Sequence, residues 1–183
     1  THKTMRKLEK KSSLKRLFIG ICFLILIPLS TKAQQYMIGA DLSFMKEAED
    51  KGFLFKENGI TKPGYELFKE HGYNWVRLRL FHNPTTLPNN LEYTIEMAKE
   101  AKKRGFKFLL DYHYSDTWAD PAKQYIPKAW EGKTQQELEV AVYTYTRSTL
   151  RAFLKAGAFP DMVQIGNEIS NGMLWPNGKL PEN

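Results

Sequence analysis

The sequence predicts an α/β fold, namely a (β/α)8 TIM barrel of which about the first four βα units are present. After residue 34, short apolar runs alternate with longer segments of helical periodicity, a pattern typical of a parallel sheet. Polar and charged residues follow the apolar runs, where a barrel gathers its functional groups. An open doubly wound sheet also fits four such units, but the first turn, residues 39–43, lacks the glycine-rich phosphate-binding pattern. We therefore favour the barrel.

The chain begins with a predicted signal peptide, residues 1–33. Basic side chains precede an apolar run at residues 17–29, which is short for a membrane span of about 20 residues. Thr31 and Ala33 are small residues that suit a cut before Gln34. We therefore expect a secreted or periplasmic protein with no membrane association after cleavage. A retained signal anchor is the alternative.

Charge and cysteine content exclude two classes of function. The formal net charge of +7 lies entirely within residues 1–33, so residues 34–183 are neutral overall and no nucleic-acid partner is expected. Cys22 is the single cysteine of the sequence and falls in the apolar run. The mature chain is therefore expected to have neither disulfides nor thiolate chemistry.

Four strands and three helices are expected along the mature chain. The apolar runs predict strands at residues 37–42, 74–81, 106–113 and 162–166. A short helix is expected at residues 64–71, and Asn90 caps a second helix over residues 91–104. Thr134 and Glu137 form a capping box that opens a third helix, which continues to residue 156. The long loop over residues 115–133 carries two tryptophans and is expected to bear part of a site.

The domain arrangement follows from length. A complete barrel needs about 250 residues, and residues 34–183 supply only 150. We therefore expect residues 34–183 to be the truncated N-terminal half of a barrel.

Titratable and amide side chains cluster at the predicted strand ends. Arg77 and Arg79 share a face because side chains alternate along a strand, and Asp111 and His113 do so on the next strand. Glu168 ends the fourth strand, where a carboxyl group can act as a general acid; glycosidase chemistry needs a second carboxyl. The alternative interpretations are structural: ion pairs in the barrel for the arginines, a hydrogen-bonded core role for His113, and a helix N-terminal acid for Glu168.

Four segments carry a family resemblance. They are GADLSF (39–44), NWVRLRLFHNP (74–84), DYHYSDTWADPAKQ (111–124) and VQIGNEISNGMLWPNGK (163–179). These segments resemble the endo-β-1,4-galactanases of glycoside hydrolase family 53. The resemblance implies a retaining (β/α)8-barrel glycosidase that hydrolyses β-1,4-galactan in type I arabinogalactan and pectin, with its acid/base after strand four and its nucleophile after strand seven.

The resemblance also implies roles for individual residues. Glu168 matches the acid/base, and the nucleophile has no counterpart in this sequence. The resemblance implies substrate-cleft positions for Arg77, Arg79, His113, Trp118, Asn167 and Trp175. Asp41 and Asp116 are expected to bind substrate because of their strand-end positions. No cofactor is expected to be required; some relatives hold a structural calcium, but no site for it is identified in this sequence.

Two other functions stay open at this stage. The missing nucleophile and the cleft aromatics also suit a non-catalytic galactan-binding remnant. A metal hydrolase with Asp111, His113 and Glu168 as ligands is a further alternative, although the sequence lacks the paired histidines of most zinc sites.

Overall fold

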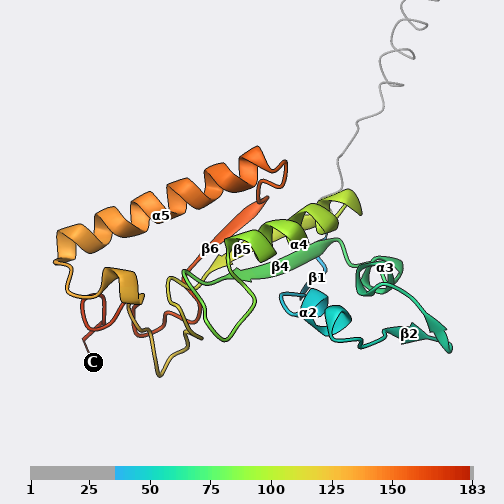
Figure 1. Ribbon diagram of the computed structural model, residues 1–183, viewed down its shortest axis with the longest axis horizontal. Coiled ribbons are helices and arrows are strands. Elements are labelled where there is room, and N and C mark those ends of the chain that lie inside the picture. Colours follow the sequence, from blue (N-terminus) through green and yellow to red (C-terminus); the bar gives the residue numbers. More distant parts are fainter. Residues whose placement is uncertain (1–35, 182–183) are drawn as a thin grey trace, which may run out of the picture. The chain divides into compact units, whose positions relative to one another are not determined.

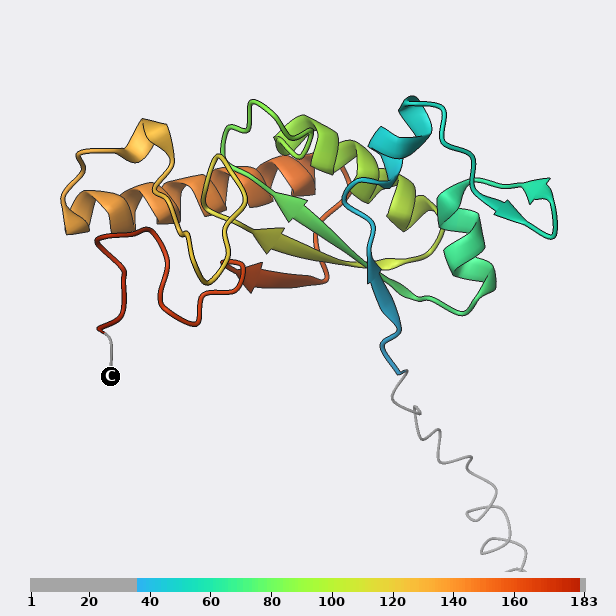
Figure 2. The same cartoon turned by 90° about the horizontal axis from the view of Figure 1, so that it is seen from below.

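The computed structural model describes residues 36–181. The predicted signal peptide, residues 1–33, lies outside these residues. Four strands form a parallel sheet in the order β1 (Gly39–Asp41), β4 (Trp75–Leu80), β5 (Lys107–Tyr112) and β6 (Met162–Ile165). Figure 2 shows β4, β5 and β6 side by side in chain order, and β1 pairs with β4 at the other edge. Parallel strands whose spatial order follows the chain are the arrangement of a (β/α)8 barrel.

The two long helices connect the sheet strands. Helix α4 (Leu91–Lys103) joins β4 to β5, and α5 (Gln135–Lys155) joins β5 to β6. Both lie on the same side of the sheet (Figure 1). The first crossover holds two short helices, α2 (Met45–Asp50) and α3 (Gly64–Glu70), and the third holds a 3-10 turn, η1 (Lys128–Trp130), shortly before α5.

Side-chain alternation separates an apolar face of the sheet from a polar one. Val76, Leu78 and Leu80 of β4 are buried in the hydrophobic core, whereas Arg77 and Arg79 point to the opposite face. The same period places Phe108 of β5 in the core, where it packs against Phe153 of α5 at a centroid distance of 5.7 Å. The helices therefore cover the apolar face, and the charged residues lie on the face that becomes a barrel interior.

The predicted strands and helices are present with ends shifted by a few residues. Asn90 accepts a hydrogen bond from the Tyr93 backbone N–H at the start of α4. Thr134 and Glu137 form the expected capping box at the start of α5. These caps satisfy N–H groups that would otherwise have no partner in the first helical turn.

Helix α2 and a small antiparallel hairpin were not predicted from the sequence. The hairpin pairs β2 (Lys56–Glu57) with β3 (Ile60–Thr61). Its turn residues, Asn58 and Gly59, have φ values of 49° and 80°. Left-handed Asn-Gly turns join hairpin strands, so this dipeptide was an available signal. Among the described residues, no helix has the length and apolar content needed to cross a membrane.

Candidate active site

A charged cluster occupies the polar face at the carboxyl ends of the strands. The strand register sets Asp41 beside Arg77, Arg79 beside Asp111, and Asp111 beside Gln164. Residues that sequence alternation placed on one face are therefore lateral neighbours across the sheet. Aspartate and arginine side chains are neighbours in this cluster, and the attraction between their opposite charges offsets the free-energy cost of removing them from water.

Arg77 is the hub of the cluster. Its Nη1 lies 2.5 Å from Asp41 Oδ2, and its Nη2 lies 2.6 Å from Asp111 Oδ2. The same guanidinium donates to Gln164 Oε1 at 3.2 Å and to Asn167 Oδ1 at 2.8 Å. One side chain from β4 thus orients groups on β1, β5, β6 and the loop after β6.

Asp111 is completely buried and is held mainly by charge. His113 Nε2 lies 3.1 Å from Asp111 Oδ2, and Arg79 Nε lies 4.0 Å from the same oxygen. Within residues 36–181, neither carboxylate oxygen accepts a hydrogen bond of good geometry, despite these short distances. We therefore attribute the stability of this buried acid to the two neighbouring guanidinium groups rather than to directed hydrogen bonds.

Arg79 lies between the cluster and an aromatic wall. Burial lowers the pKa of its guanidinium, an effect opposed by the nearby carboxylates of Asp41, Asp111 and Glu168. The group stays charged because an arginine guanidinium keeps its proton in proteins. Its guanidinium carbon lies 4.2 Å from the ring centroid of Trp118, a cation–π distance.

Trp118 and His113 complete this wall. The Trp118 ring stacks against Phe44 at 6.4 Å and meets the His113 ring at 5.6 Å in an edge-to-face arrangement. The His113 Nδ1 accepts a hydrogen bond from the Ala119 backbone N–H at 3.3 Å, which fixes the loop that carries Trp118. His113 is buried, and Phe81 packs against its ring at 4.3 Å.

The predicted acid, Glu168, follows β6 in an unusual backbone conformation. Gly166 and Glu168 have φ values of 74° and 51°, in the left-handed region that residues other than glycine seldom adopt. Asn167 between them is buried, and its amide Nδ2 donates to Ala119 O at 2.8 Å. The Glu168 side chain is exposed and makes no hydrogen bond or ion pair with any described residue. A carboxyl in this setting is accessible to a substrate.

Asp116 does not join the charged cluster. Its Oδ1 lies 3.3 Å from His82 Nδ1 and accepts from the Asn83 backbone N–H, while its Oδ2 accepts from the Lys128 N–H. Both oxygens therefore tie together the loops that follow β4 and β5. The structure gives Asp116 a loop-fixing role, and its contact with substrate stays a prediction.

Asp41 is also occupied by protein contacts. Beyond its ion pairs with Arg77 and Arg79, its Oδ1 accepts from the Ser43 hydroxyl at 2.5 Å. Ser43 Oγ in turn accepts from the Arg79 backbone N–H at 2.9 Å. Ser43 and Gln164 are site residues that the sequence reasoning missed. The register of β6 beside Asp111 was the signal for Gln164.

Trp175 lines a separate cleft of about 660 Å³ between the loops that follow β5 and β6. Its indole N–H donates to Asn171 O at 3.1 Å, and the Lys179 ammonium lies 4.9 Å from its ring centroid. Ser170 and Asn171 also line this cleft, and they follow Glu168 closely in the sequence. Trp175 therefore lies beside the loop that carries Glu168, in a cleft that Trp118 does not line.

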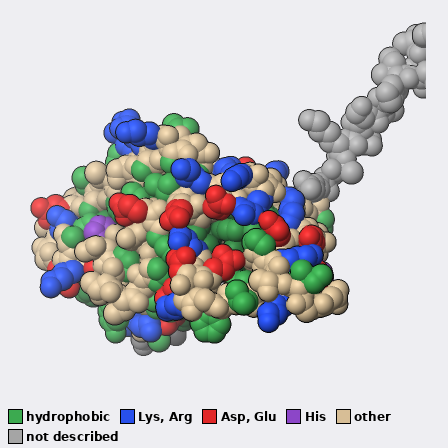
Figure 3. Space-filling view, turned by 45° about the vertical axis from the view of Figure 1, so that its right-hand side comes forward, with side chains coloured by type: hydrophobic (Ala, Val, Ile, Leu, Met, Phe, Trp, Pro, Cys, Tyr) green, Lys and Arg blue, Asp and Glu red, His purple; other side chains and the backbone are tan. Residues whose placement is uncertain are grey.

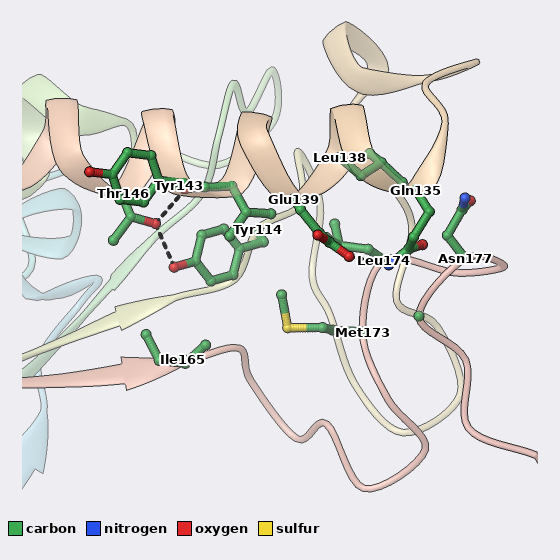
Figure 4. Close-up of a pocket in the computed structure, with 12 residues that line it drawn as sticks. Tyr114, Gln135, Leu138, Glu139, Tyr143, Thr146, Ile165, Met173, Leu174 and Asn177 are labelled. Atoms are coloured by element: carbon green, nitrogen blue, oxygen red, sulfur yellow. Dashed lines mark hydrogen bonds between the residues drawn. The ribbon is translucent and has the colours of Figure 1, made fainter.

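An apolar groove lies away from the charged cluster. It measures about 500 Å³ and runs between α5 and the chain after β6 (Figure 4). Ile165, Met173 and Leu138 point into it, and Tyr114 donates or accepts a hydrogen bond with Thr146 at 2.8 Å along its wall. The groove has few polar groups that could orient a reacting molecule, so the strand-end cluster is the better candidate site.

Two surface properties bear on possible ligands. Figure 3 shows Lys and Arg side chains interspersed with Asp and Glu on one face of the molecule. That face therefore offers no broad patch of a single sign. Within residues 36–181, no three or more His, Cys, Asp or Glu side chains are grouped so as to hold a metal ion.

The fold and the strand-end cluster define part of a (β/α)8 barrel with a polar site at the carboxyl ends of its strands. Residues 37–183 match glycosyl hydrolase family 53, and the chain belongs to this family. The family expected from the four sequence segments is thereby confirmed.

Individual relatives support the same assignment. The chain is 42% identical over 159 residues to a probable arabinogalactan endo-β-1,4-galactanase A of Aspergillus terreus, covering 86% of this chain and 45% of the relative. It is 44% identical over 147 residues to the arabinogalactan endo-β-1,4-galactanase of Cellvibrio japonicus, covering 79% and 39%. The chain thus spans less than half the length of these relatives.

Solved structures confirm the fold. The GH53 catalytic domain of Ignisphaera aggregans superimposes with a TM-score of 0.75 at 40% identity, covering 79% of this chain and 42% of that domain. A fungal β-1,4-galactanase structure gives 0.76 at 42% identity, covering 80% and 44%. The four βα units correspond to part of a (β/α)8 barrel.

Proposed function

We propose that the protein is an endo-β-1,4-galactanase that hydrolyses β-1,4-galactosidic bonds in type I arabinogalactan and pectic galactan. Membership of family 53 and the names of its relatives support a galactan substrate. The observation that carries the catalytic part is the position of Glu168. Its exposed carboxyl follows β6, one residue after an asparagine that Arg77 holds within the charged cluster.

Glu168 is the proposed general acid and base. Protonation of the departing glycosidic oxygen requires a carboxyl that reaches solvent-accessible substrate, and the Glu168 side chain meets this need. A retaining mechanism needs a second carboxylate about 5 to 5.5 Å away as nucleophile. Among the described acids of the cluster, Asp41 and Asp111 are both paired with arginine. We therefore propose that the nucleophile comes from a later strand of the barrel.

The neighbouring groups supply substrate contacts in this proposal. Asn167, whose amide is held by Arg77 and Ala119, lies next to the acid, and Trp118 offers a flat ring for the apolar face of a galactose unit. Arg79 and His113 contact the Trp118 ring and hold it in place. Trp175 extends the cleft beyond the acid loop.

The test is the substitution Glu168→Gln in the complete gene product. We expect a loss of about two to four orders of magnitude in galactan hydrolysis, because the amide cannot transfer a proton. Glu66→Gln on α3, an exposed acid outside the cluster, is the matched control and should retain full activity. Near-normal turnover by Glu168→Gln would contradict the proposal. Binding of galactan by the unsubstituted protein with no new reducing ends would instead support a non-catalytic galactan-binding protein.

A further inference from the structure

The side chain of Gln124 is buried, with only 2% of its surface exposed, between the loops that follow β5 and β6. Its amide Nε2 donates to the backbone oxygen of Asn167 at 2.8 Å and approaches that of Glu168 at 3.5 Å. We propose that Gln124 is a positioning residue that holds the Asn167-Glu168 backbone and so aims the Glu168 carboxyl at the glycosidic oxygen. This inference rests on the proposed galactanase function.

The chemistry of the contact requires a hydrogen-bond donor. A third backbone oxygen, from Asp120, lies 3.1 Å from the same Nε2. Three carbonyl oxygens therefore surround one NH2 group, and carbonyls only accept hydrogen bonds. A carboxylate of the same size would direct negative charge at three acceptors in a buried place, which is unfavourable.

Backbone hydrogen bonds fix the position of Gln124, so that it can hold the loop after β6 in place. The preceding turn is closed by reciprocal backbone hydrogen bonds between Asp120 and Lys123 at 2.9 and 3.0 Å. The Asp120 carboxylate accepts from the Ala122 backbone N–H at 2.9 Å. The Gln124 carbonyl accepts from the Trp175 N–H at 2.7 Å. Gln124 therefore forms hydrogen bonds with the chain after β6 at two places, residues 167–168 and residue 175.

The backbone of Glu168 must be fixed by neighbouring residues, because within the described part of the chain its own side chain makes no hydrogen bond that would orient it. The carboxyl makes no hydrogen bond with a described residue and has only a through-space attraction to Arg79, so its direction depends chiefly on its backbone. That backbone is in the left-handed region, which is unfavourable for a residue with a side chain and persists only where neighbours enforce it. Arg77 and Ala119 fix the Asn167 side chain, and Gln124 fixes the main chain of both residues.

The central test is Gln124→Glu in the complete gene product, because it replaces the donor by an acceptor with little change in shape. A misplaced acid lowers kcat/KM on galactan, for which we expect a loss of about 30- to 100-fold. An aryl β-galactobioside with a dinitrophenolate leaving group needs no proton for bond cleavage. Its kcat/KM should therefore change by less than about threefold.

A second variant and a pH series separate positioning from folding. Gln124→Met removes the donor without adding charge and should show the same selective loss on galactan. Lowering the pH protonates the carboxyl introduced by Gln124→Glu and restores one O–H donor. The defect of this variant relative to the unsubstituted protein should then shrink, whereas that of Gln124→Met should not. Gln136→Glu at an exposed position of α5 is the matched control and should leave both rates unchanged.

The possible results have distinct meanings. Equal losses on galactan and on the activated substrate would overturn the inference and leave Gln124 a purely structural residue. Unchanged rates in both variants would overturn it as well. If the unsubstituted protein fails to cleave galactan while it cleaves the activated galactobioside, the proposed function fails and the positioning role fails with it. If the unsubstituted protein is active and only the Gln124 comparison fails, the proposed function stands alone.

Discussion

The guanidinium of Arg77 joins the ends of neighbouring strands into one polar network. It is paired with Asp41 on β1 and with Asp111 on β5, and it donates to Gln164 on β6. Asp111 is completely buried, so its charge depends on this arginine and on Arg79. Loss of one partner of a buried ion pair leaves an uncompensated charge, which costs more than the pair contributed.

We therefore predict that Arg77→Met destabilises the protein by about 3 kcal/mol. Urea unfolding followed by circular dichroism gives the free energy of unfolding. The double variant Arg77→Met with Asp111→Asn should recover part of the loss, because the buried charge is then absent. A cost below about 1 kcal/mol for the single substitution would show that Arg79 alone satisfies Asp111.

The residues of the site differ in how far the sequence could predict them. Strand alternation was enough to place Arg77 and Arg79 on one face, since a period of two fixes the direction of each side chain. Asp116 lies in a loop, where no period applies, and its contacts with His82 and Lys128 depend on tertiary folding. The role of Gln124 was hidden for the same reason, because the site residues that it contacts, Asn167 and Glu168, are 43 and 44 residues away along the chain.

Secondary-structure elements show the same division. Helices α4 and α5 were predicted because each combines a long apolar period with a side-chain cap. Helix α2 has six residues and no side-chain hydrogen bond at its N-cap, Phe44, so local sequence gave little sign of it. It forms because Met45 is buried in the core and the Glu47 backbone N–H donates to the Tyr93 hydroxyl at 3.0 Å. Tertiary contacts thus decide the short elements.

Asp161 connects three elements at the amino ends of the strands. Its Oδ2 accepts from the Phe108 backbone N–H at the start of β5 and from the Lys102 ammonium at the end of α4, both at 2.9 Å. Burial alone raises the pKa of this carboxyl, but the two hydrogen bonds outweigh it, so the pKa lies below its ordinary value of 3.8. A lowered pKa in the folded state means that the charged carboxylate stabilises the fold.

The sign of the pH dependence follows directly. The contribution of Asp161 is complete above pH 3.8, the ordinary pKa, and is lost as the pH falls through the lower folded value. We predict that Asp161→Asn lowers the free energy of unfolding by about 1 kcal/mol near neutral pH. The difference from the unsubstituted protein should shrink as the pH is lowered below 3.8. A difference that stays constant down to about pH 2 would contradict the assignment.

At the scale of the whole molecule, apolar surface is concentrated along one side of α5. Tyr143 and Leu154 are 64% and 63% exposed, and Ile165 at the outer edge of β6 is 52% exposed. The groove of Figure 4 lies between these elements. In a (β/α)8 barrel the next strand pairs with this edge and the next helix covers this side of α5. Contiguous apolar surface beside an open strand edge otherwise promotes association.

We predict that residues 34–183 produced alone self-associate through the open edge of β6 and the exposed side of α5. Sedimentation velocity between about 1 and 100 µM should show a mass that rises with concentration. The pair Tyr143→Lys and Leu154→Lys should reduce association, because each places a charge where apolar contact is needed. Thr144→Lys with Ser148→Lys adds the same charge to exposed polar positions of α5 and should reduce it much less. A monodisperse monomer throughout this range would show that the open edge is protected within the chain itself.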